Sequence, residues 1–164
     1  MIRYARFESP LGPVLAIADE AGITHIDFVG AKYERRIEPD WIEDPRASAL
    51  AACGRQLAEY FAGTRTAFDL PLSPRGSDFQ QRVWREIARI PYGETISYGE
   101  LARRAGAPGQ ARAAGAATGR NPVGVVIPCH RIVGADGSLT GYAGGLERKR
   151  GLLELEGALQ KSLV

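Results

Sequence analysis

The chain has 164 residues, 45% hydrophobic and 24% charged, which is enough for one domain or two small lobes whose core needs no disulfide staple. Its apolar runs are short and interrupted, which excludes a membrane span of about 20 apolar residues. Residues 1–74 carry 8 basic and 11 acidic side chains and residues 75–164 carry 13 and 8, which indicates either an anionic partner for the second half or a solvated basic face.

The first part of the chain has the pattern of strands joined by tight turns. Hydrophobic and polar residues alternate, and clusters of turn residues separate three such stretches. In the third stretch, Thr24, Ile26 and Phe28 share one side. The pattern predicts an antiparallel meander with strands at residues 2–7, 14–18 and 23–29.

A helix is expected after these strands. Asp44 would cap it and Pro45 would take the first helical position, where the missing N–H of proline costs nothing. Apolar residues then recur at helical spacing as far as Gly63. Residues 65–77 show no period and contain prolines, so we interpret them as a linker. Two domains are therefore predicted, at residues 1–74 and 75–164.

The second half has the pattern of a mainly helical lobe. Two Ser-x-x-Gln/Glu capping boxes, beginning at Ser77 and Ser97, predict helices that start at residues 78 and 98. A glycine-containing turn at residues 106–109 leads into a helix of small side chains at 110–119. Two short helices joined in this way outline a helix-turn-helix, although many pairs of core helices share that outline.

The last third combines an apolar run, a glycine-rich loop and a helix. Residues 123–127 are continuously apolar and end at Pro128, which predicts a buried strand. The final helix is expected at residues 146–156, weakened by roughly 1 kcal/mol at Gly151. The fold class is therefore α+β, with a small antiparallel sheet and a helix in the first lobe and mainly helices in the second.

The two cysteines differ in their surroundings. Cys129 follows the predicted strand and is succeeded by His130 and Arg131. Thiolate is the reactive form of cysteine, and nearby positive charge or a paired base promotes it. Cys53 lies on the apolar face of its helix and is interpreted as structural. Two cysteines are too few for a secreted disulfide scaffold, so we expect a cytoplasmic protein without a signal peptide.

Four segments of the second half resemble the O6-alkylguanine-DNA alkyltransferases. The resemblance covers residues 78–157 nearly throughout, whereas the first lobe resembles the family only loosely, in its strand pattern and the turn at residues 7–12. The segments are an active-site signature at 121–131, the start of a helix-turn-helix at 91–98, a recognition helix at 110–115 and an active-site loop at 141–146.

The resemblance implies a ribonuclease H-like first lobe and a winged-helix-like second lobe. It implies a single-turnover DNA repair enzyme that flips the damaged nucleotide and moves the alkyl group irreversibly from O6-alkylguanine to Cys129, with O4-alkylthymine as a further candidate substrate. The partner would be double-stranded DNA, bound in the minor groove without sequence preference. The protein would be a monomer, with cooperative DNA binding left open, and would need no cofactor.

The resemblance also assigns catalytic roles residue by residue. Cys129 would be the nucleophile, and His130 would remove its proton through a water molecule. Glu156, which by itself would be interpreted as a surface residue, would orient the imidazole as in a catalytic triad. Tyr98 would donate a hydrogen bond to N3 of the leaving guanine, and Asn121 would brace the turn that carries the site.

The base and the DNA would be bound by further residues of the second lobe. The base would contact the carbonyls of Cys129 and Ile132, the Ala143 amide and the neighbouring Gly144, with Tyr142 as a wall. Many relatives have Ser at the position of Ala143, which could alter the tolerance for bulky alkyl groups. Arg112 would fill the place of the flipped nucleotide, and Tyr98 would crowd its phosphate. Other DNA contacts would come from Ser97, Ala113, Gly115 and Arg120, whereas Arg131 could equally brace the fold.

Alternatives from other classes fit the residues less well. A cysteine hydrolase would need its Cys and His apart in sequence, and a non-catalytic damage binder would lack Cys129. A regulator that senses alkylation would carry more methyl-accepting cysteines and further DNA-binding domains. A zinc site in the first lobe would have only His25 and Cys53 as ligands, so we expect no metal.

Overall fold

The computed structural model describes residues 1–159 and divides the chain into two compact units. The first unit holds Met1–Arg75 together with Pro122–Val126, and the second holds Gly76–Asn121 and the described residues from Ile127 onward. The predicted domains were continuous, so the second segment of the first unit is an addition that the sequence pattern did not indicate. Within residues 1–159, no helix has the length and apolar character needed to span a bilayer.

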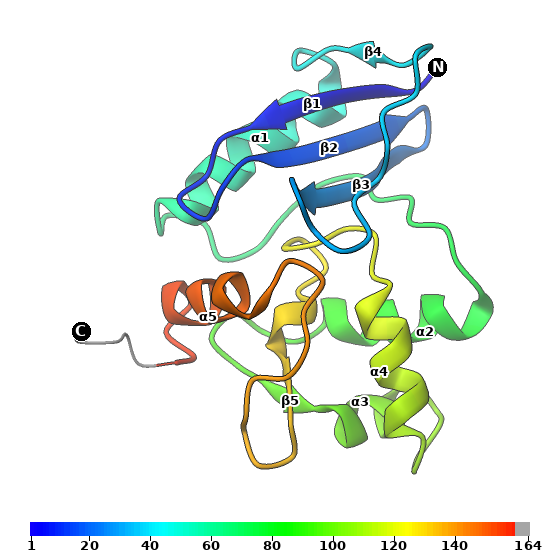
Figure 1. Ribbon diagram of the computed structural model, residues 1–164, viewed down its shortest axis with the longest axis vertical. Helices are drawn as coiled ribbons and strands as arrows, with labels where there is room; N and C mark the ends of the chain where they lie inside the picture. The colour runs from blue at the N-terminus through cyan, green and yellow to red at the C-terminus, as the bar shows by residue number, and fades with distance from the viewer. Residues whose placement is uncertain (160–164) are drawn as a thin grey trace. The chain divides into compact units, whose positions relative to one another are not determined.

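The first unit contains a four-stranded sheet in the order β3-β2-β1-β4 (Figure 1). The three predicted strands and their antiparallel pairing are confirmed. β4 was not predicted, because two residues are too few to show an alternating pattern; it lies parallel to β1 at the edge of the sheet. The strands are β1 (Arg3–Phe7), β2 (Val14–Asp19), β3 (Gly22–Phe28) and β4 (Ile42–Glu43).

Helix α1 (Ser48–Phe61) packs on one face of this sheet (Figure 1). The predicted start at Asp44 is wrong, since the cap residue is Ala47. The backbone N–H of Asp44 donates to Tyr4, which extends the edge of the sheet, and a turn separates it from the helix. The predicted end is confirmed by Gly63, whose φ of 81° suits a glycine just beyond the helix.

The apolar segment Pro122–Val126 is not the predicted strand. Val123 forms one isolated bridge to β3, and the N–H of Val126 donates to the carbonyl of Gly124 at 2.8 Å in a tight turn. Val125, between them, has a φ of 68°, which an extended strand does not allow. The segment is apolar because it packs against β3 at the edge of the four-stranded sheet. An apolar run by itself does not distinguish such a packed turn from a buried strand.

The second unit is built around four helices and a two-stranded parallel ladder. A short 3₁₀ turn, Cys129–Arg131, leads directly into β6. The mixture of a small sheet and helices confirms the α+β class. The helices are α2 (Asp78–Ala88), α3 (Tyr98–Arg104), α4 (Ala111–Gly119) and α5 (Leu146–Leu155), and the ladder joins β5 (Ile96–Ser97) to β6 (Ile132–Val133).

Of the two predicted capping boxes, one is complete. Ser77 and Gln80 exchange both hydrogen bonds at the start of α2. At α3 the Ser97 hydroxyl accepts the N–H of Glu100 at 3.1 Å, but the reciprocal bond is replaced. The Glu100 carboxylate instead accepts hydrogen bonds from Arg103 and Arg104, because two guanidinium groups one turn away compete for it.

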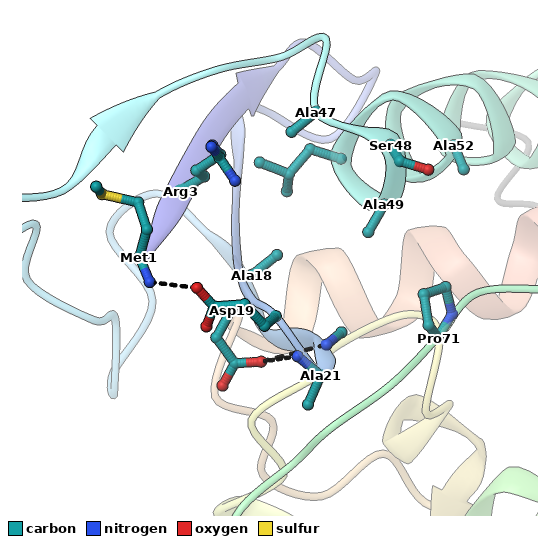
Figure 2. A pocket seen from close by; sticks show the side chains of 13 residues that line it. Met1, Arg3, Ala18, Asp19, Ala21, Ala47, Ser48, Ala49, Ala52 and Pro71 are labelled. Carbon is teal, nitrogen blue, oxygen red and sulfur yellow. Dashed lines mark hydrogen bonds and ion pairs between the residues drawn. The ribbon is translucent and has the colours of Figure 1, made fainter.

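A cavity of about 350 Å³ opens in the first unit, between the start of α1 and the turn after β2 (Figure 2). Small side chains line much of it, and the Asp19 carboxylate at its edge accepts the N–H of Ala21 at 2.8 Å. Its lining contains no cysteine or histidine, so the cavity does not hold the thiol and imidazole that the sequence singled out.

Candidate active site

Cys129 is held at the start of the 3₁₀ turn, where the chain leaves Pro128. Its N–H donates to the carbonyl of Ile127 at 2.8 Å, and the N–H of Arg131 donates to the carbonyl of Pro128 at 2.9 Å. The residue is 8% exposed, so the thiol lies just beneath the surface of the second unit. Pairing of Ile96 with Ile132 then fixes β6, which immediately follows this turn.

His130 and Glu156 form a buried pair next to Cys129. His130 Nε2 lies 2.8 Å from Glu156 Oε2, and neither side chain is exposed to solvent. Glu156 is the C-cap residue of α5, and it is not the surface residue that its place near a helix end indicates. A carboxylate here fixes the imidazole in one orientation, as in a catalytic triad.

Arg131 completes the environment of that carboxylate. Its Nε donates to Glu156 Oε1 at 2.8 Å and its Nη2 to Oε2 at 2.9 Å, while Nη1 donates to the carbonyl of Ile90 at 2.6 Å. Glu156 therefore receives three charge-assisted or polar hydrogen bonds away from water. Of the two roles considered for Arg131, the structure supports bracing the fold.

The hydrogen bond to Glu156 determines which nitrogen of His130 can act as a base. An ionised carboxylate only accepts, so Nε2 carries the hydrogen and Nδ1 keeps its lone pair. Nδ1 is buried and has no hydrogen-bond partner among residues 1–159. Burial lowers the pKa of His130 below its ordinary value, with the Glu156 hydrogen bond acting in the opposite direction. The imidazole is therefore neutral near pH 7, and Nδ1 is the nitrogen that can accept a proton.

Lys149 is a further buried charged residue, and the sequence interpretation gave it no role. Its side chain is fully buried, and Nζ donates to the carbonyl of Ile132 at 2.6 Å and to that of Thr140 at 3.2 Å. Burial lowers its pKa to about 8, and charge on Cys129 counters that shift. Helical periodicity could have predicted that Lys149 is buried, because it lies on the same face of α5 as Leu152 and Glu156.

Tyr98, the first residue of α3, lies against the loop that precedes α5. The hydroxyl of Thr140 is 2.9 Å from the hydroxyl of Tyr98. On α4, a Cβ added at Gly115 would be in ordinary contact with the Tyr98 ring, at 3.4 Å, so the ring lies beside this helix. The pairing of β5 with β6 brings Tyr98 near the loop, because α3 begins directly after β5 and the loop begins directly after β6.

Helix α4 turns a face of small side chains and arginines toward solvent. Arg112, Ala113 and Arg120 are exposed, whereas Ala114 and Ala117 are buried. The indole N–H of a buried tryptophan, Trp84, donates to the carbonyl of Ala117 at 2.9 Å and ties α4 to α2. The exposed face of α4 therefore carries short side chains and positive charge, which suits close approach to a nucleic-acid groove.

The other predicted residues occupy the turns around Cys129. Asn121 Nδ2 donates to the carbonyl of Ile127 at 2.8 Å. Tyr142, Ala143 and Gly144 lie in the loop before α5 and are partly exposed. Of the predicted site residues, the structure joins His130 to Glu156 directly and links Tyr98 to the loop that carries Tyr142. Residues 1–159 contain no cluster of three His, Cys, Asp or Glu side chains that could hold a metal ion.

Fold and site together define a class of protein. A near-surface thiol beside a buried histidine–carboxylate pair is suited to nucleophilic chemistry, and two short helices with a small-residue outer face are suited to DNA. The second unit is therefore that of a cysteine-dependent group-transfer protein with a helix-turn-helix.

Comparison with known proteins identifies the family. Residues 2–74 match the family model described as the ribonuclease-like domain of 6-O-methylguanine DNA methyltransferase, and residues 78–158 match its DNA binding domain. The chain belongs to the 6-O-methylguanine DNA methyltransferase family.

Similar proteins from three organisms agree with this assignment. A protein of Mycolicibacterium paratuberculosis, named methylated-DNA–protein-cysteine methyltransferase, is 51% identical over 95% of this chain and 93% of its own length. A protein of the same name from Methanosarcina acetivorans is 46% identical over 94% of this chain and 98% of its own length. The crystal structure of Mycobacterium tuberculosis OGT in complex with DNA superposes with a TM-score of 0.86 at 48% identity, covering 95% and 93% of the two chains.

Proposed function

We propose that this chain repairs DNA by moving the alkyl group from O6 of an alkylated guanine onto the sulfur of Cys129. The observation that carries the proposal is the His130–Glu156 pair beside the thiol, with Nδ1 of the imidazole buried and unpartnered within the described chain. Two relatives named methylated-DNA–protein-cysteine methyltransferase support the same substrate. A relative crystallised with DNA supports it as well.

The transfer begins with the thiol. His130 Nδ1 takes the Cys129 proton through one bridging water molecule, because adjacent side chains do not face each other directly. The thiolate attacks the alkyl carbon, a C–S bond forms, and the C–O6 bond breaks with its electron pair left on guanine. Tyr98 donates its hydroxyl hydrogen toward N3 of the departing base. The thioether is stable, so each molecule reacts once.

The base would be recognised mainly through backbone groups. The carbonyls of Cys129 and Ile132 would accept from its amino group, and the Ala143 amide would donate near O6. Tyr142 and Gly144 would complete the wall of the pocket, and the bond from Asn121 to Ile127 would brace the turn beneath it. O4-alkylthymine is a further candidate, since it presents an equivalent alkyl ether.

The duplex would be bound in the minor groove by α4, without sequence preference. Arg112 would occupy the place of the flipped nucleotide and Tyr98 would crowd its phosphate, with Ala113 and Gly115 facing the groove. Ser97 and Arg120 would contact phosphates. On this proposal, residues 75–164 bind DNA and transfer the alkyl group, and residues 1–74 support them.

The protein would act as a monomer, with cooperative binding along DNA left open. It would work in the cytoplasm, because the chemistry requires Cys129 to stay reduced.

Intact-mass spectrometry after incubation with an oligonucleotide that carries O6-methylguanine tests the proposal. One methyl group should replace one hydrogen per protein molecule, and peptide mapping should place it on Cys129. Methyl on Cys53, or more repaired guanine than protein, would contradict the mechanism.

The role of Arg112 has its own test. Arg112→Ala should slow transfer from duplex DNA by about tenfold or more, and should slow transfer from a single-stranded oligonucleotide much less, because a single strand needs no wedge to unstack the base. Arg89→Ala, which removes an exposed arginine of the same unit next to α2, is the charge-matched control. Equal slowing by both variants would reduce Arg112 to a general phosphate contact.

A further inference from the structure

The hydroxyl of Tyr98 has a neighbour that the transfer mechanism does not yet use. Thr140 Oγ1 lies 2.9 Å from Tyr98 Oη, and both side chains are partly buried. The Tyr98 ring lies beside Gly115 of α4, where an added Cβ would be in ordinary van der Waals contact with the ring, at 3.4 Å. The tyrosine thus stands between α4 and the loop before α5, and the Thr140 contact fixes its oxygen.

A phenol has one hydrogen, which prefers to lie in the plane of the ring and so has two favoured directions. When Thr140 donates to Tyr98 Oη, it occupies one of these directions, and the tyrosine hydrogen points the other way. The same bond stabilises negative charge on Oη as the tyrosine hydrogen moves toward an acceptor.

Lys149 holds the backbone of Thr140 in position for this contact. Its Nζ donates to the carbonyls of Ile132 at 2.6 Å and Thr140 at 3.2 Å, and lies 3.5 Å from that of Gly141. Ile132 lies in β6, whereas Thr140 and Gly141 lie in the middle of the loop between β6 and α5, so one buried ammonium ties the middle of the loop to the strand. Thr140 is thus in an anchored part of the loop.

We infer that Thr140 is a positioning residue that directs the Tyr98 hydrogen toward the alkylated base. The inference rests on the proposed function and deepens it. As Cys129 takes the alkyl group and the C–O6 bond breaks, the electron pair passes into guanine and the Tyr98 hydrogen moves to N3. Oη gains negative charge, which the Thr140 hydrogen bond stabilises, and the proton is later restored from solvent.

Single-turnover kinetics on duplex DNA with O6-methylguanine test this role. Thr140→Val keeps the shape of the side chain and removes the donor, and should lower the transfer rate at saturating DNA by about threefold to tenfold, with the half-saturating DNA concentration little changed. Thr140→Ser restores the donor and should recover most of the rate. Ser138→Ala, which removes an exposed hydroxyl from the same loop, is the matched control and should react like the wild type.

A double-mutant cycle with Tyr98→Phe separates positioning from general support of the loop. If Thr140 acts through Tyr98, Thr140→Val should have almost no further effect once the hydroxyl of Tyr98 is gone. The same loss in both backgrounds, or failure of Thr140→Ser to recover the rate, would overturn the inference and leave the proposed function standing. A wild-type protein that transfers no methyl group would overturn both.

Discussion

Each unit of the molecule contains one cysteine and a shielded carboxyl group, and the surroundings of these groups differ between the two units. Cys53 lies in the apolar face of α1, where burial raises its pKa to about 12. Cys129 is also buried, but it keeps 8% of its surface exposed and stands beside His130, with Lys149 close enough to interact with its charge. Burial by itself silences a thiol, and a neighbouring base and cation are what make a buried thiol usable.

The two carboxyl groups repeat the contrast. Asp27, on β3, has its Oδ2 shielded without a hydrogen-bond partner in residues 1–159, and burial raises its pKa to about 7, despite a hydrogen bond from the backbone of Arg35. Glu156 is more deeply buried and yet receives hydrogen bonds from Arg131 and His130. The charged form of a shielded carboxyl is thus disfavoured in one unit and supplied with charged partners in the other.

The largest effect is expected from substituting the two cysteines one at a time. Cys129→Ser should abolish methyl transfer and retain DNA binding, because a serine hydroxyl is not ionised by this base. Cys53→Ala should transfer at the wild-type rate, although its lost packing should lower the melting temperature. Transfer rate and an electrophoretic mobility shift on the same DNA measure both properties. Residual transfer by Cys129→Ser, or its loss in Cys53→Ala, would break the distinction between the two thiols.

Glu156→Gln should have the next largest effect. It leaves the Arg131 guanidinium buried without its counter-charge, so the free energy of unfolding should fall by about 3–5 kcal/mol. The His130 base loses its orienting carboxylate as well, and the transfer rate should fall by about 100-fold in protein that is still folded. Urea unfolding and single-turnover kinetics measure the two losses. Glu147→Gln, at an exposed position of the same helix, should change neither appreciably.

Asp27→Asn should change the pH dependence of stability. The pKa of Asp27 is raised, so the folded chain binds this proton more tightly than the unfolded chain, and wild-type stability is full below about pH 3.8 and lost as pH rises through about 7. Between pH 5 and 8.5 the wild type should lose on the order of 2 kcal/mol more than Asp27→Asn. Urea unfolding at several pH values measures the difference. Parallel curves for the two proteins would show that Asp27 does not titrate in that range.

The smallest effect is expected from pH on the reaction itself. Because burial lowers the pKa of His130, the imidazole stays neutral well below the ordinary histidine range. The transfer rate should therefore fall by less than about twofold between pH 7.5 and 6.0, whereas a base with the ordinary histidine pKa would lose about fourfold. A fourfold fall would mean that the Glu156 hydrogen bond offsets burial.

The sequence predicted elements where the pattern was local. Alternation gave the three strands of the meander, and the Ser77–Gln80 box gave the start of α2, because strand faces and capping bonds depend on residues a few positions apart. It failed where a distant partner intervened. Asp44 was drawn into the edge of the sheet, and residues 123–127 packed against β3 instead of forming a strand. The second capping box failed for a local reason, because Arg103 and Arg104 bind the Glu100 carboxylate.

The sequence by itself determined the family and the segment that carries the chemistry. The run from Asn121 to Arg131 is contiguous, and its order of residue types is specific to this family. Only the tertiary structure decided that Glu156 is buried against His130, that Arg131 braces it, and that Lys149 and Thr140 hold the loop beside Tyr98. The reason is physical: whether a charged side chain meets water or a partner depends on which elements pack around it, and a linear pattern does not contain that information.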